Sequence, residues 1–374
     1  MKQRWVVGSV LLAVAIAAAV TAGLATRASA APAQAKLTKL TFQLKWVPQA
    51  QFAGYYAASL KGFYKQAGLD VTLKNGGPDI IPEQVVASGQ AQFGVDWLPS
   101  LMSARDKGTD LVNVAQVFAR SGMTEITWKS SGINSIAKMK NKKVGNWLGG
   151  NEFELFAALN KNGMNPEKNK GVTIVQQPFD MGLFLSKKID AASAMTYNEL
   201  AQVLESKNPK TGKLYQLSDL NVLKMQNVGT GMLEDGIFST GSWLKSPANQ
   251  ATAVKFIAAS LKGWIYCRDH MADCVSMTLK EGPTLPKGHQ TWMMNEINKL
   301  VWPADKGGIG IMNKAAYAQT AKIAQQFGVI KKAPTGAYRT DLAAKAVASL
   351  KAAGADVNGT SWKAPVVHVT AGGK

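Results

Sequence analysis

Aromatic residues follow four of the strands that this sequence predicts. The segments 42–45, 93–96, 144–146 and 191–196 are typical of strands, and they end at Trp46, Trp97, Trp147 and Tyr197. In open α/β sheets, ligands bind outside the carboxyl ends of the strands. Flat aromatic faces on two sides can sandwich a planar heterocycle or face a cation. We therefore predict an aromatic-walled ligand pocket; the structural alternative is that each ring only caps the core.

Polar side chains accompany these aromatic residues. They supply amide donors, carbonyl acceptors and carboxylates: Gln49, Gln51, Asp96, Asn146, Asn151, Glu152, Asn198, Glu199, Glu234 and Asp235. A few convergent polar groups in an aromatic pocket are typical of a small-molecule site. We predict that all of them except Asn146 and Asn198 bind the ligand, together with the four aromatic residues. Alternatively, Glu152 and Glu199 stabilise the first turns of their helices.

The same positions offer little for catalysis. The three histidines, at 270, 289 and 368, lie outside the predicted cleft, and the chain has neither a G-x-S-x-G nor an H-E-x-x-H motif. The turn at Gly149-Gly150-Asn151 could present backbone N–H groups to an anion. It lacks the P-loop and dinucleotide-binding patterns, so a simple tight turn is favoured. We expect no enzyme activity, no catalytic residue and no cofactor.

The two cysteines, Cys267 and Cys274, lie close together in the sequence. Pairing is favoured in an oxidising compartment, but a disulfide also depends on a Cα separation that sequence does not give. His270 lies between them, although a zinc site needs more ligands nearby. A disulfide is therefore one of two open alternatives, and no metal site is expected.

Strand-like and helix-like segments alternate along the chain, which predicts an α/β fold with mostly parallel strands. Strands are expected at 40–46, 70–74, 91–96, 111–118, 125–129, 142–146, 172–176 and 191–195, with helices such as 52–66 and 152–162 between them. From Asn227 onward the pattern is mainly helical. The length is that of two typical domains, so two lobes are expected.

The order of the segments suggests where each lobe lies. Residues 36–123 and 227–352 are expected to form a discontinuous first lobe, and 124–226 a second. Two glycine-containing crossings, Ser121–Thr124 and Gly229–Gly236, would form the hinge. Residues 353–374 are expected to be a loose C-terminal tail.

The chain carries a formal net charge of +19. Its lysines are scattered rather than grouped with aromatic residues on one stripe, which argues against nucleic-acid binding. A solvated, lysine-rich surface is the favoured interpretation. Weak attraction to an anionic membrane or to an acidic partner is the alternative.

The first thirty residues have the pattern of a cleaved signal peptide. Lys2 and Arg4 precede an apolar run, which leads to the small residues Ala28-Ser29-Ala30. An uncleaved anchor is the alternative. We expect a soluble protein that is exported to the periplasm.

Several segments carry a family resemblance: Lys45–Ala58, Gly62–Tyr64, Gly68–Val71, Val86–Gly89, Ala194–Glu199 and Glu234–Gly236. In combination they resemble the nitrate/sulfonate/taurine and thiamine-pyrimidine-precursor family of periplasmic solute-binding proteins of ABC importers. The last two segments are more similar to the thiamine-pyrimidine branch. The resemblance implies a type II periplasmic-binding-protein fold with a two-crossing hinge. Its implied partners are a small-molecule ligand and the permease and ATPase of the importer, and we expect a monomer.

The resemblance also implies site residues, because Trp46, Tyr197 and Glu199 match positions that line the pyrimidine site of that branch. The related eukaryotic pyrimidine synthase has a histidine within the segment that here reads 48–54, and a cysteine-rich motif. This chain has Phe52 and no cysteine cluster, so synthase activity is not expected. The additional tryptophans suggest a broader ring, so riboflavin stands beside a thiamine pyrimidine precursor.

Three other functions stay open. A receptor for a small anion such as an alkylsulfonate, taurine or nitrate would need cations at the cleft, and Arg105 and Arg120 are the nearby arginines. A sensor domain would deliver its ligand to a signalling partner. A cofactor-free enzyme on the same fold is the third alternative.

Overall fold

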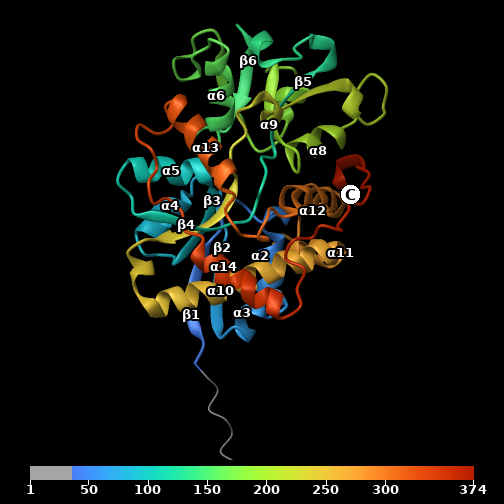
Figure 1. Ribbon diagram of the computed structural model, residues 1–374. Coiled ribbons are helices and arrows are strands. Elements are labelled where there is room, and N and C mark those ends of the chain that lie inside the picture. The colour runs from blue at the N-terminus through green and yellow to red at the C-terminus, as the bar shows by residue number, and fades with distance from the viewer. Residues whose placement is uncertain (1–35) are drawn as a thin grey trace, which may run out of the picture. The chain divides into compact units, whose positions relative to one another are not determined.

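Two five-stranded sheets organise residues 36–374, the part of the chain that the computed structural model describes (Figure 1). The predicted signal peptide, residues 1–30, lies outside the described residues. From Leu37 to Lys374 the chain forms one contiguous unit. Within it, each sheet and its helices form one lobe of a two-lobed α/β architecture, as the sequence predicts.

The first sheet has the strand order β2 (Leu69–Lys74), β1 (Thr38–Gln43), β3 (Phe93–Trp97), β10 (Asp235–Thr240) and β4 (Leu111–Gln116). Strands β1, β2 and β3 are parallel, and β10 runs antiparallel between β3 and β4. All five residues of β3 are buried, which fits the apolar run of a strand covered on both faces.

The second sheet has the order β7 (Thr173–Gln176), β6 (Lys143–Asn146), β8 (Ala191–Met195), β5 (Met123–Trp128) and β9 (Leu220–Lys224). Strands β6, β7 and β8 are parallel, and β5 runs antiparallel between β8 and β9. Each sheet therefore has three adjacent parallel strands with their carboxyl ends on one edge. Beside them lie one antiparallel strand, β10 or β5, and one outer strand, β4 or β9, that runs in the same direction as the three.

Helices cover both sheets. Those that follow strands of the first sheet, or that come after β10, are α2 (Ala53–Leu60), α3 (Phe63–Gln66), α4 (Pro82–Ala87), α5 (Leu98–Asp106), α10 (Pro247–Asp269), α11 (Met271–Glu281), α12 (Lys287–Val301), α13 (Lys314–Gln326) and α14 (Asp341–Ala352). Those of the second sheet are α6 (Phe153–Lys161), α7 (Gly182–Leu185), α8 (Glu199–Leu204) and α9 (Met225–Val228). Helix α12 contacts α8 and α13 contacts α6, so these two helices join the lobes (Figure 1).

The long helix α10 packs closely against α2 in the first lobe. A Cβ atom on Gly263 would lie 1.9 Å from the carbonyl oxygen of Gly54, so the two backbones approach too closely for any side chain there. Cys267 in α10 and Cys274 in α11 form a disulfide with their Cα atoms 5.4 Å apart. Of the two alternatives that the sequence left open, the disulfide is the one found in the structure.

Two strands, β9 and β10, were not predicted from the sequence. Strand β10 lies in the middle of the first sheet, although the chain from Asn227 was expected to be mainly helical. A glycine such as Gly236 more often interrupts a strand than continues it. Here a Cβ atom would lie 2.3 Å from Asn113 Nδ2, so the glycine allows close packing within the sheet. The helix expected over 52–66 is also divided, because Gly62 has φ +73°.

The C-terminal segment contains only the short 3-10 helix η7 (Ala371–Gly373) after α14. Its end is held against the body of the protein, since Gly372 N donates to the Glu205 carbonyl at 3.0 Å and Gly373 is buried. The segment expected as a loose tail therefore packs at its end. No helix among residues 36–374 is long and apolar enough to span a bilayer.

Candidate functional site

A narrow pocket lies between the carboxyl ends of the parallel strands of the two sheets. Its lining comes from the ends of β1, β3, β6 and β8 and from the turns that follow them: Lys45, Trp46, Gln49, Gln51, Trp97, Trp147, Asn151, Met195, Tyr197, Asn198 and Glu199. The pocket encloses about 30 Å³, room for about two water molecules. This volume is smaller than a heterocycle needs, so the structure describes a closed pocket.

Aromatic residues form the walls of this pocket on both sides. Trp46 and Trp97 come from the first lobe, and Trp147 and Tyr197 from the second, so the structure brings all four predicted aromatic residues together. Trp97 is buried, and its Nε1–H has no hydrogen-bond partner among residues 36–374. Trp147 Nε1 donates to the Pro178 carbonyl at 3.2 Å, which orients its ring.

Glu199 supplies a buried carboxyl group to the pocket. Its Oε2 accepts from Met195 N at 3.0 Å, and its Oε1 accepts from Asn198 Nδ2 at 2.8 Å. Burial raises the pKa of Glu199 to about 7, against the backbone hydrogen bond from Met195. Near neutral pH this carboxyl can therefore donate or accept a hydrogen bond. That property suits a ring carrying both an acceptor nitrogen and an amino group.

Two glutamines in the first lobe link the pocket to a second buried acid. Gln49 Nε2 donates to Gln51 Oε1 at 2.6 Å, and Gln51 Nε2 donates to Asp235 Oδ2 at 2.9 Å. Burial raises the pKa of Asp235 to about 7. Asp235 therefore orients Gln51 from behind the pocket and does not line it.

Lys45 is the one basic side chain in the pocket lining. Its Nζ forms an ion pair with Asp96 Oδ1, which also accepts from Trp97 N at 2.6 Å. Burial alone would lower the pKa of Lys45, but the acidic groups around it, Asp96 first and then Glu83 and Asp235, together outweigh burial and raise the pKa. Asp96, which does not line the pocket, therefore neutralises the charge of Lys45. Little positive charge is left in the pocket to bind an anion.

The hinge is held by two buried glutamates rather than by ligand contacts. Glu234 Oε1 accepts from Gly122 N at 2.6 Å and from Met123 N at 3.1 Å. Glu154 accepts from Ser121 Oγ at 2.8 Å and from Met232 N at 2.7 Å, and so joins both crossings. Burial raises the pKa of Glu154 to about 8 and that of Glu234 well above its usual range.

The structure thus divides the predicted ligand residues. Eight of them line the pocket: Trp46, Gln49, Gln51, Trp97, Trp147, Asn151, Tyr197 and Glu199. Asp96, Glu234 and Asp235 bind neighbouring protein groups as described, and Glu152 Oε2 accepts from Gly150 N at 2.7 Å in the turn before α6. In each of these four cases a nearer protein donor or cation takes the carboxylate.

Three lining residues were not among the predicted ligand contacts. Lys45 directly precedes Trp46, Met195 lies two residues before Tyr197, and Asn198 directly follows Tyr197. In extended chain, residues two apart share a face, so Met195 and Tyr197 could have been paired. The expectation that every histidine lies away from the cleft was wrong. His289 Nε2 lies 2.9 Å from Asn198 Oδ1 in the pocket wall.

Known proteins can now be compared with this geometry. A family model described as "NMT1/THI5 like" matches residues 49–273, which is more than half of the chain. The chain belongs to this family. The match spans the aromatic and polar pocket residues from Gln49 to Glu199, as well as the hinge glutamates.

The proteins similar to this family member include a putative thiamine biosynthesis protein and a riboflavin-binding protein. A putative thiamine biosynthesis protein of Haemophilus influenzae is 27% identical over 41% of this chain and 48% of its own. The riboflavin-binding protein RibY of Chloroflexus aurantiacus is 26% identical over 64% of this chain and 65% of its own. The chain thus matches about half of the first relative's length and about two thirds of the second's.

Solved structures share the fold of this family member. The periplasmic aliphatic sulphonate binding protein SsuA of Escherichia coli superposes with a TM-score of 0.60 at 15% identity, over 80% of this chain and 90% of its own. At that identity the likeness concerns the fold alone. The chain therefore has the periplasmic-binding-protein fold.

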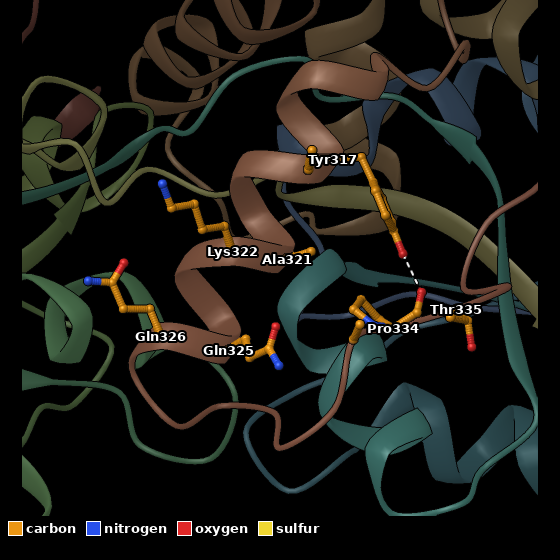
Figure 2. Close-up of a pocket in the computed structure, with 9 residues that line it drawn as sticks. Tyr317, Ala321, Lys322, Gln325, Gln326, Pro334 and Thr335 are labelled. Carbon is orange, nitrogen blue, oxygen red and sulfur yellow. Dashed lines mark hydrogen bonds between the residues drawn. The ribbon is translucent and has the colours of Figure 1, made fainter.

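A second, wider hollow lies on the surface beside α13 (Figure 2). Tyr317, Ala321 and Lys322 border it from the helix and Pro334 and Thr335 from the following loop; Tyr317 Oη donates to the Pro334 carbonyl at 2.7 Å. It has no facing aromatic pair and no buried acid among its lining residues. The pocket between the lobes therefore remains the better candidate for ligand binding.

Proposed function

We propose that this family member is the solute-binding component of an ABC importer and that its ligand is a planar heteroaromatic vitamin or vitamin precursor. A thiamine pyrimidine precursor and riboflavin are the two candidates. The observation that carries this proposal is the set of four aromatic side chains facing one pocket from two lobes, with the Glu199 carboxyl among them. The names of the two relatives support the same ligand classes.

The pocket chemistry supports a flat, hydrogen-bonding ring. Trp46, Trp97 and Trp147 offer aromatic faces to such a ring. Glu199 can pair with an amino group and an adjacent ring nitrogen in its two protonation states. The amide groups of Gln49 and Asn198 add polar groups to the same lining.

A small anion is less well supported as the ligand. Lys45 is already paired with Asp96. Arg105 donates to the carbonyls of Leu111 and Thr335, and Arg120 donates to those of Leu300 and Pro303. Neither arginine lines the pocket, so a sulfonate or nitrate would find no unpaired cation there.

Transport into the cell requires partner proteins in the membrane. We propose that a cleaved signal peptide exports the chain to the periplasm, where it works as a monomer and delivers ligand to a permease and its ATPase. We also propose that it has no enzyme activity and needs no cofactor.

One experiment tests the ligand class. The protein is purified from its native host, and any co-purifying compound is examined by absorbance and mass spectrometry. Titration calorimetry then follows with riboflavin, 4-amino-5-hydroxymethyl-2-methylpyrimidine and taurine. We expect tight binding of one ring compound and none of taurine. Tight binding of taurine alone would overturn the proposal.

A further inference from the structure

His289 reaches from a helix of the first lobe into the second lobe. It lies in the first turn of α12, and both His289 and its partner Glu205 are more than nine-tenths buried. Its Nδ1 lies 3.0 Å from each carboxyl oxygen of Glu205, which follows α8. Three residues further along the same face of α12, Trp292 Nε1 donates to the Thr196 carbonyl at 3.0 Å. The helix therefore holds the second lobe at two points.

The neighbours of His289 decide its protonation. Gln202 Nε2 donates to the Phe179 carbonyl and to Asn198 Oδ1, each at 3.2 Å, so Oδ1 is the acceptor end of the Asn198 amide. The Asn198 Nδ2 group correspondingly donates to Glu199. His289 Nε2, at 2.9 Å from Oδ1, must then carry a proton.

The other ring nitrogen also needs a proton. Nδ1 faces two carboxyl oxygens, and a carboxylic acid is ordinarily a stronger acid than an imidazolium. A proton on Nδ1 would satisfy both carboxyl oxygens and make His289 a cation paired with the Glu205 carboxylate. No other ion pair to His289 is found among residues 36–374.

We propose that His289 is a positioning residue of the ligand site. As an imidazolium it clasps Glu205 and orients the Asn198 amide, which in turn directs the Glu199 carboxyl into the pocket. It acts without touching the ligand, because His289 is not part of the pocket lining. His289 then contributes both to closure of the lobes and to the orientation of the main polar group of the pocket.

The first test needs no ligand. The chain has three histidines, so long-range 1H–15N NMR of the whole labelled protein, with His270→Gln and His368→Gln for assignment, isolates the His289 ring. At pH 7 we expect both of its nitrogens to be protonated in the ligand-free protein, and only one in Glu205→Gln. A His289 ring with one bare nitrogen in the unmodified protein would overturn the proposal.

The second test is a double-mutant cycle on ligand affinity, and this part rests on the proposed function. With riboflavin and the aminopyrimidine as probes, His289→Gln and Asn198→Ala should each weaken binding by about tenfold, the effect of losing a hydrogen bond to a charged group. Because both act on Glu199, the double variant should bind about as well as Asn198→Ala alone. The exposed His368→Gln serves as the control and should bind like the unmodified protein.

The two tests separate the possible failures. Additive losses in the cycle would show that His289 acts independently of Asn198 and would overturn the positioning role. If the unmodified protein binds neither probe, the proposed ligand class fails, and the NMR measurement still decides the state of the clasp.

Discussion

Trp46 and Phe179 meet edge to face between the two lobes, with ring centroids 5.2 Å apart and an interplanar angle of 85°. Trp46 follows β1 in the first lobe, and Phe179 follows β7 in the second. The same tryptophan that lines the pocket therefore also touches the opposite lobe. The pocket wall and the contact between the lobes therefore share one side chain.

Phe179→Ala should speed ligand release. Edge-to-face aromatic pairs contribute about 0.5–1.5 kcal/mol, so we expect the dissociation rate to rise by about 2- to 10-fold. Stopped-flow tryptophan fluorescence measures this rate. Leu217→Ala is the matched control, because Leu217 is a similarly exposed apolar residue of the same lobe, at 53% against 47% exposure, and does not line the pocket. Equal release rates for the two variants would contradict the closing role of Phe179.

Trp147→Ala should weaken ligand binding by about tenfold or more, as expected for a buried aromatic contact. Trp147→Phe keeps a flat aromatic face and should retain most of the affinity. Titration calorimetry measures the affinity of both variants for whichever of the two ring compounds binds the unmodified protein. Trp362→Ala serves as the control, since this half-buried tryptophan lies outside the pocket lining. If Trp147→Ala, Trp147→Phe and Trp362→Ala bind the ligand with equal affinity, the aromatic wall does not contact the ligand.

Glu199→Gln should change the pH dependence of stability. Burial raises the pKa of Glu199 to about 7, above the ordinary value of about 4.3 in the unfolded chain. The native state therefore binds more protons between these values, and stability falls as pH rises from about 4.3 to 7. At pH 8 the variant should be more stable than the unmodified protein by up to about 3 kcal/mol, with little difference at pH 4.

Urea unfolding at pH 4 and pH 8 measures that difference. Asp235 and Glu154 also have raised pKa values, but both are present in the two proteins and their contributions cancel. A difference in unfolding free energy that does not vary with pH would mean that Glu199 has the same pKa in the native protein as in the unfolded chain, and would contradict its raised pKa.

Cys267→Ser should lower the free energy of unfolding by about 2–3 kcal/mol, the chain-entropy cost of opening a short loop. The two cysteines are seven residues apart and form the disulfide between α10 and α11. Thermal unfolding of Cys267→Ser, Cys274→Ser and the double variant measures the loss. The double variant should match the single ones, because either substitution alone removes the bridge. Equal stability of the unmodified protein before and after reduction would argue against a bridge in solution.

Much of the fold and the centre of the pocket could be predicted from the sequence. The alternation of buried strands and helices indicated two α/β lobes, and the aromatic residues at four strand ends indicated one shared pocket. Such predictions succeed because parallel strands bring their carboxyl ends to one edge, so local position along the chain gives position in space. The antiparallel strand β10 was missed because its Gly236 has a role only in the finished sheet.

The roles of the charged and polar groups were decided by the tertiary structure. Lys45 pairs with Asp96, 51 residues away, and His289 contacts Asn198, 91 residues away. No local pattern connects such residues, and a carboxylate binds whichever donor or cation packing brings nearest. Burial then sets the protonation of Glu199 and Asp235, because desolvation depends on the surrounding atoms and not on the neighbours in sequence. The amino-acid sequence alone thus determined where a ring could lie, and only the packing of the two lobes decided which polar groups would face it.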